Sequence, residues 1–189
     1  MAAVWTVVGV VAVLVLWGVA VFNGLIRKSN LVKEGWSGVE TQLKRRADLI
    51  PNLVETVKGY AAHERTTFDE VTAARTRSLS ARGAAERGPA EQAFGAAIGS
   101  LMAVAERYPD LKASANFLAL QSELAKVEDD IQLARRYYNA TVRDLNIQIQ
   151  SFPSNLISGP FGFKPADYFE IENASDRQAP SVSFNVQRA

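Results

Sequence analysis

The first 26 residues contain no ionisable side chain, and this run constrains the chain more than any other feature of its sequence. As an α-helix it would be about 39 Å long at about 1.5 Å per residue, enough to cross the roughly 30 Å hydrocarbon layer of a bilayer. A cleaved secretory signal is the alternative, since Gly18-Val19-Ala20 offers a small-x-small cleavage site. However, no Lys or Arg precedes the run, which is longer than the apolar core of about 7 to 15 residues in such signals. We therefore predict a retained transmembrane anchor over residues 1–26.

Positive charge lies directly after the anchor. Arg27, Lys28 and Lys33 follow it, whereas only the terminal amine precedes it. Because an excess of Lys and Arg marks the cytoplasmic side of a membrane helix, we expect a single-pass protein with its N-terminus outside and its body in the cytoplasm.

The charge balance and the lack of cysteine exclude several function classes. The 21 Lys and Arg nearly match the 20 Asp and Glu, so the chain as a whole has no field that would attract nucleic acid. With no cysteine, the chain cannot form a disulfide framework, a thiolate nucleophile, a Cys-ligated zinc site or an iron–sulfur cluster.

Residues 31–82 have the apolar spacing of three and four that is typical of a helix with one buried face. The phase continues through Pro51, which favours one long helix kinked there. The alternative is a second helix with Asp48 as its N-cap. The anchor has no Gly or Pro run between it and this helix, so the two can be continuous.

Two further helices are predicted. Residues 81–89 contain two glycines and a proline and predict a turn, after which a helix runs over residues 90–107. Tyr108-Pro109 interrupts it, since a residue before proline disfavours helix. The next helix carries a sustained period of about 3.5 residues, which indicates coiled-coil-like packing against the first helix or a neighbouring chain. Its apolar series is Phe117, Leu120, Leu124, Val127, Ile131, Ala134, Tyr138, Thr141, Leu145, Gln148 and Phe152.

The pattern changes after Phe152-Pro153, where Gly and Pro forbid a regular helix although aromatic residues remain frequent. Val182, Phe184 and Val186 then alternate with polar residues, as in a short strand. We thus predict an all-α fold in three parts: a transmembrane anchor (1–26), a bundle of long antiparallel helices (27–152), and an irregular aromatic C-terminal segment ending in a short β-strand (153–189).

Several stretches of the chain resemble the LemA family. They are QLKRRADLIPNLVETVKGY (residues 42–60), ERYPDLKA (106–113), Asn116-Phe117, Glu123-Leu124, Tyr138-Asn139 and FPSNL (152–156). The resemblance covers nearly the whole chain. It implies a membrane-anchored helical bundle in the bacterial cell envelope, hence the inner (cytoplasmic) membrane, and brings no catalytic residues. A relative associated with magnetosome membranes suggests a role in membrane organisation.

No motif indicates an enzyme or a cofactor site. His63 is the only histidine, and Tyr60 stands three residues before it, where a helical di-metal site typically has Glu. We expect a solvated or hydrogen-bonded histidine. Neither a G-x-S-x-G elbow nor a glycine-rich phosphate loop occurs. We therefore expect a non-enzymatic protein without catalytic residues, metal or cofactor.

Polar residues on the helical seams are the candidates for assembly. They are Arg46, Glu64, Glu128, Arg135, Asn139 and Asn146. They either fix the register of the chain's own bundle or form a self-assembly surface. The C-terminal segment packs on its own bundle, dips into the membrane interface, or clasps a neighbouring protomer, and an unpaired strand favours the clasp. Its candidate residues are Phe161, Phe163, Phe169, Val182, Phe184 and Val186.

These features predict a membrane-anchored scaffold that forms a homo-oligomer at the cytoplasmic face, with the lipid bilayer as its other partner and no nucleic acid. The alternative is an adaptor or regulator that presents a membrane-protein client to a membrane enzyme such as an envelope protease.

Overall fold

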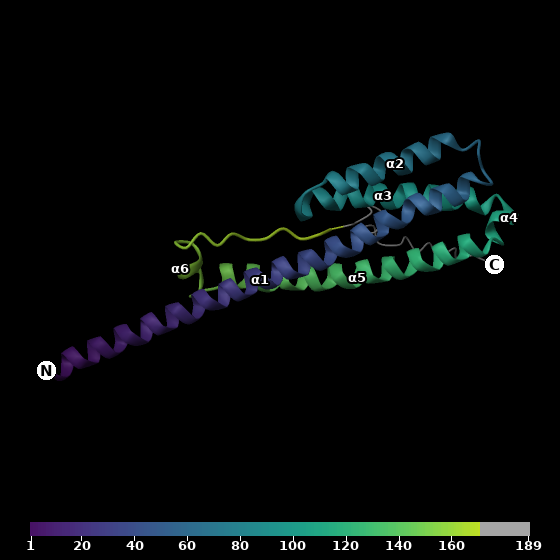
Figure 1. Cartoon of the computed structure of the whole chain (residues 1–189). Coiled ribbons are helices and arrows are strands. Elements are labelled where there is room, and N and C mark those ends of the chain that lie inside the picture. Colours follow the sequence, from purple (N-terminus) through teal and green to yellow (C-terminus); the bar gives the residue numbers. More distant parts are fainter. Residues whose placement is uncertain (171–189) are drawn as a thin grey trace, which may run out of the picture.

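The computed structural model describes residues 1–170, which form six helices and no strand (Figure 1). The helices are α1 (Ala2–Lys58), α2 (Arg65–Ser80), α3 (Gly83–Glu106), α4 (Pro109–Lys112), α5 (Ala115–Gln150) and α6 (Asn155–Ser158). The predicted all-α bundle with an N-terminal apolar helix is confirmed. The strand expected at Val182, Phe184 and Val186 falls outside the described residues, and residues 1–170 supply no strand that could support it.

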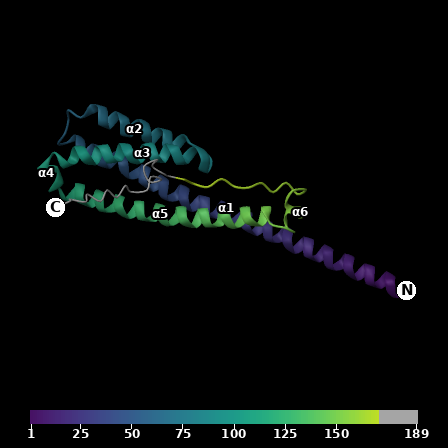
Figure 2. The same ribbon diagram turned by 180° about the vertical axis from the view of Figure 1, so that it is seen from behind.

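Helix α1 is continuous from the apolar run into the bundle. Its first part projects from the body as a lone helix, and both views show this (Figures 1 and 2). Within residues 1–170, α1 alone is long and apolar enough to cross a membrane, by length and composition. Leu25 is buried, and from Val32 onward a buried residue recurs every three or four positions, so the apolar run and a core helix belong to one continuous rod. The helix also runs through Pro51, which confirms that one helix continues past that proline and that Asp48 does not cap a second one.

Helix α1 ends at Lys58, so the predicted continuation to residue 82 is wrong. The chain turns over residues 59–64, where the amide of Ala61 donates to the carbonyl of Val57 (2.9 Å). Gly59 is a poor helix former, and the turn lets α2 fold back onto the bundle. The apolar spacing continues across the turn because Ala61 is itself buried, and this hides the break from a periodicity argument.

Helix α3 begins at Gly83, seven residues before the predicted start. The turn needs only Ala81 and Arg82, because Gly83 has a positive φ of 69° that reverses the chain at once. Pro89 lies inside the helix, where it removes a single backbone hydrogen bond without ending it. The interruption at Tyr108-Pro109 is confirmed and contains the short α4.

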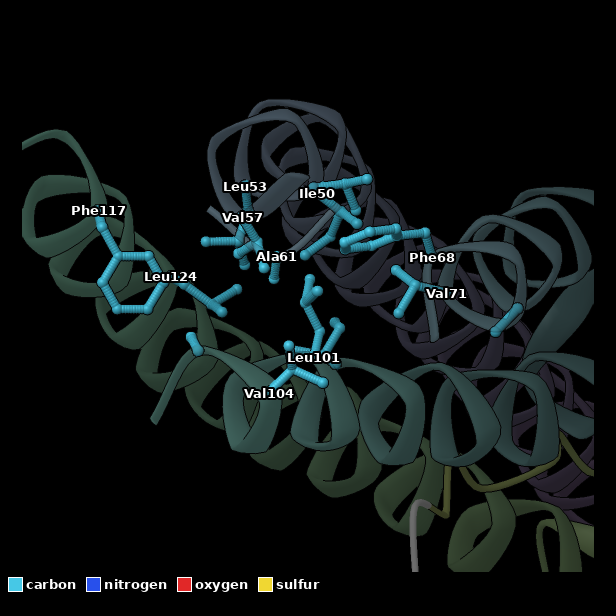
Figure 3. Packing of buried hydrophobic residues seen from close by; sticks show 14 of the residues in the cluster. Ile50, Leu53, Val57, Ala61, Phe68, Val71, Leu101, Val104, Phe117 and Leu124 are labelled. Atoms are coloured by element: carbon cyan, nitrogen blue, oxygen red, sulfur yellow. The ribbon is translucent and has the colours of Figure 1, made fainter. Parts of the chain in front are cut away.

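Helices α1 and α5 lie antiparallel along most of the body, and the α2–α3 hairpin covers the end far from the N-terminus (Figures 1 and 2). There, apolar side chains from α1, α2, α3 and α5 converge in one core (Figure 3). A second core fills the space between α1, α5 and the chain that follows α6. Gly35 permits the close approach of α1 to α5, since a Cβ there would lie 3.2 Å from the Cα of Tyr138.

Candidate functional site

A buried ionic cluster links all four main helices. Arg46 on α1 and Glu91 on α3 have side chains only 5% and 0% exposed, and the Arg46 guanidinium donates to the Glu91 carboxylate. Its other terminal nitrogen donates to Glu128 Oε1 on α5 (2.9 Å). Ser78 on α2 and Arg87 on α3 both donate to Glu91 Oε1, at 2.6 and 3.1 Å. The buried charges are therefore paired and hydrogen-bonded, as burial requires.

The structure thus brings together two of the candidate seam residues, Arg46 and Glu128. Sequence reasoning missed Glu91, Arg87 and Ser78. The available signal was the i, i+4 spacing of Arg87 and Glu91, but these residues flank Gly88-Pro89, which was assigned to a turn. Arg46 also lies over the Phe94 ring, with its guanidinium carbon 5.2 Å from the ring centroid.

Glu64 lies apart from this cluster. It precedes α2 at the turn, and its Oε1 accepts a hydrogen bond from Arg107 Nη2 (2.6 Å). It therefore ties the α1–α2 turn to the end of α3.

Asn139 and Asn146 hold the segment that follows α6. Each side-chain amide makes two hydrogen bonds to one residue of the segment, donating to its carbonyl and accepting from its N–H. Asn139 pairs in this way with Phe169 (3.1 and 2.9 Å), and Asn146 with Ala166 (2.9 and 2.9 Å). Seven helical residues advance about 10.5 Å and three extended residues about 10 Å, so the two spacings match. We call residues 164–170, held in this way, the strap.

Tyr138 adds a third bond to the strap, as its hydroxyl donates to the carbonyl of Asp167 (2.8 Å). Burial raises the pKa of Tyr138 above its usual 10.0, and the nearby charge of Asp167 raises it further. The phenol therefore stays protonated and able to donate at neutral pH.

Three aromatic residues of the C-terminal segment pack on their own chain. Phe169 is fully buried, with its ring 5.5 Å from that of Trp36. Phe161 and Phe163 lie against Phe22 of α1, with ring centroids 5.1 and 5.7 Å apart. Val182, Phe184 and Val186 lie outside the described residues.

Arg135 lines a surface cavity of about 390 Å³ beside the strap. Arg136 and Arg143 also line it, together with Asn139, Tyr168 and Glu170. Three arginines and one carboxylate among the lining residues give this hollow a basic character, and Arg143 is also paired with Asp144 (3.2 Å). Within residues 1–170, His, Asp and Glu side chains nowhere gather in a group of three that could hold a metal ion, and His63 belongs to no such group.

Comparison with known proteins places this architecture in a family. The family model described as "LemA family" matches residues 35–184. The magnetosome protein MamQ 2 of Paramagnetospirillum magneticum is 28% identical over 181 residues, a match that covers 82% of this chain and 66% of the relative. MamQ of Magnetospirillum gryphiswaldense is 26% identical over 166 residues (74% and 61%). Protein LemA of Metamycoplasma hominis is 29% identical over 138 residues (72% and 63%).

This chain spans slightly less than two thirds of the length of these relatives. The family model, however, covers most of the chain, including the end of α1, all of α2 to α6 and the strap. The chain therefore belongs to the LemA family.

Proposed function

We propose that this protein is a non-enzymatic scaffold, anchored in the bacterial inner membrane by residues 1–26, that self-associates at the cytoplasmic face. The observation that carries the proposal is the continuity of α1, whose 57 residues would extend about 86 Å. A continuous helix between the anchor and the bundle holds the bundle at a fixed height and orientation over the bilayer. Neighbouring copies would then meet side by side with the same faces in register. A role in membrane organisation follows from such an array, and the magnetosome relatives support it.

The outer face of α5 supplies a surface for self-association. Leu118, Leu133 and Tyr137 are all about half exposed. At 3.6 residues per turn their side chains fall within an arc of about 100°, so they lie along one stripe of α5 that the rest of residues 1–170 leaves exposed. Three large apolar side chains that are held upright on the membrane in one stripe would pair with the same stripe of another copy.

The mass of the full-length protein in detergent at micromolar concentration tests this proposal. We expect an oligomer, and we expect the double substitution Leu133→Glu/Tyr137→Glu to yield monomers, because it places charges in the stripe. Leu79→Glu on α2 is the matched control, since Leu79 is similarly exposed on another face, and it should leave the mass unchanged. A monomeric unsubstituted protein would refute self-association.

The C-terminal clasp belongs to the same proposal. Phe161, Phe163 and Phe169 contact the chain's own helices, so a clasp on a neighbour would depend on the residues beyond 170. Deletion of residues 177–189 should then lower the oligomer mass. An unchanged mass removes the clasp from the proposal while leaving the α5 stripe in place.

A second candidate function is an adaptor for a membrane enzyme such as an envelope protease. The basic cavity lined by Arg135, Arg136 and Arg143 favours it, because such a hollow suits an acidic segment of a client. Cross-linking in cells from Arg136→Cys, carrying a cysteine-directed photo-cross-linker, distinguishes the two functions. An adaptor gives one stoichiometric heterologous product, whereas a scaffold gives products of this chain alone.

A further inference from the structure

The end of the bundle nearest the anchor contains a second charge-free stretch. No ionisable side chain occurs between Asp144 and Lys164. This stretch comprises the last turns of α5, all of α6 and the turn that leads to the strap. We call residues 152–163 the base.

The base lies beside the apolar part of α1 rather than above it. At the upper limit of the stretch, Lys28 Nζ donates to the carbonyl of Asp144 (3.1 Å). Below that point, Gly18 faces Ile157, whose Cδ1 would lie 3.8 Å from a Cβ on the glycine. The charge-free stretch of α5 and α6 and the charge-free run of α1 therefore end at the same level.

This placement puts part of the base at the depth of the hydrocarbon layer. A helix needs about 20 residues to cross that layer. Whichever 20 residues of the 26-residue run cross it, residues 15–20 are among them. Val15, Gly18 and Val19 line an apolar cavity of about 320 Å³ together with Phe22, Ile157 and Phe161. Ile157 and Phe161 therefore reach the layer wherever the run sits.

The outward face of the base is apolar. Phe152, Leu156 and Phe161 are 78%, 60% and 63% exposed. Exposing three large apolar side chains within residues 152–161 to water costs free energy, at about 25 cal/mol per Å² of apolar surface. The same surface is favourable against lipid.

The N–H groups of residues 155–163 meet the requirement that a membrane imposes on backbone donors in irregular structure. Every N–H from Asn155 to Phe163 donates to a carbonyl of the chain, and Pro160 has none to donate. The hydroxyls of Ser154 and Ser158 donate to the carbonyls of Gln148 (2.6 Å) and Ile149 (2.9 Å). An unsatisfied donor costs several kcal/mol in hydrocarbon, and residues 155–163 leave no backbone N–H unsatisfied.

We propose that the base is a second membrane contact, which inserts into the leaflet on the side of the bundle with Phe152, Leu156 and Phe161 against phospholipid acyl chains. The proposal rests on α1 crossing the bilayer, which is the anchoring part of the proposed function. Arg27 and Lys164, the first cations beyond the two charge-free stretches, then lie at the level of the headgroups. The body is thus attached to the bilayer at two points, one spanning and one shallow.

Depth-dependent quenching in the full-length protein tests the proposal. The chain has no cysteine, so Leu156→Cys takes a single environment-sensitive fluorophore without further changes. Phosphatidylcholine–phosphatidylglycerol vesicles with nitroxide-labelled acyl chains provide the lipid quencher, and iodide provides the aqueous one. We expect the lipid quencher to act severalfold more strongly than iodide at position 156. Leu79→Cys on α2 is the control and should show the reverse.

Val11→Cys in the apolar run separates the two proposals. Lipid quenching at 11 with only iodide quenching at 156 would overturn the second contact and leave the anchor intact. Protection from both quenchers at 156 would also overturn it, since the base would then be covered by protein from a second copy. Absence of lipid quenching at position 11 would overturn the anchor and the second contact together.

Discussion

At the scale of single residues, Glu91 is the centre of the bundle's polar cluster. Its carboxylate is fully buried and accepts from Arg46, Arg87 and Ser78, so it is the shared partner of two buried guanidinium groups. Glu91→Ala removes the buried carboxylate that both cations share, although Arg46 keeps Glu128, and the loss of one member of a buried pair costs about 3 to 5 kcal/mol. Denaturant unfolding of the full-length protein in detergent, followed by circular dichroism, measures the change.

The control for Glu91 is Glu123→Ala. Glu123 pairs with Arg45 at 3.5 Å while both side chains remain nearly half exposed, so its loss should cost at most about 1 kcal/mol. Equal effects of the two substitutions would show that the buried cluster contributes no more than a surface pair.

Asn139 and Asn146 determine the position of the strap. The double substitution Asn139→Ala/Asn146→Ala removes four hydrogen bonds, each worth about 1 kcal/mol. We expect the amides of Ala166 and Phe169 to lose protection from hydrogen exchange while the amides of α1 keep theirs. Asn116→Ala, at an exposed position of α5, should leave the protection of both sets of amides unchanged. Retained protection at Ala166 and Phe169 would mean that Trp36 and Tyr138 alone hold the strap.

The seven-residue spacing of Asn139 and Asn146 predicted their shared face from the sequence, but it did not predict what they bind. Their partners are the backbone groups of Ala166 and Phe169, in a segment without secondary structure. Any residue offers such groups, so no side-chain pattern marks them. The same limit applies to Glu91, whose partners come from other helices.

At the scale of the helices, apolar periodicity predicted the long α1 and α5, with their pairing as one of two alternatives. It did not locate the end of α1, because buried Ala61 keeps the spacing through the turn at Gly59. Nor did it locate the start of α3, because glycine and proline were taken to end helices although Pro89 lies within one. These boundaries depend on how the α2–α3 hairpin packs on α1, which is a tertiary effect.

Two glycines one turn apart in α1 provide a paired prediction. Gly35→Ala places a Cβ 3.2 Å from the Tyr138 Cα on the facing helix. The backbone there must shift, and we expect a net loss of about 1 to 3 kcal/mol. Gly38→Ala meets no atom within 4 Å and should gain about 0.5 to 1 kcal/mol from helix propensity. Thermal unfolding of both variants measures the two changes in stability. Changes of the same sign would contradict the close crossing of α1 and α5.

At the scale of the whole molecule, the structure predicts how far the body extends from the bilayer. Residues 27–58 of α1 lie beyond the charge-free run and would reach about 48 Å at about 1.5 Å per residue. Electron microscopy of vesicles that contain the full-length protein should show a protein layer of about this thickness on one side of the bilayer. A thin layer in the unaltered protein would indicate a bundle that lies flat.

The uninterrupted course of α1 also determines angular relations. Each added or deleted residue in a helix turns everything beyond it by about 100°. A single alanine inserted near Val13 would therefore leave the anchor as apolar as before, yet swing its outer half by more than a quarter turn about the bundle. Anchors of adjacent copies would then present different sides to one another, although every contact within the body stayed intact. The number of residues in α1 therefore determines the rotational position of the anchor relative to the bundle as well as the length of the helix.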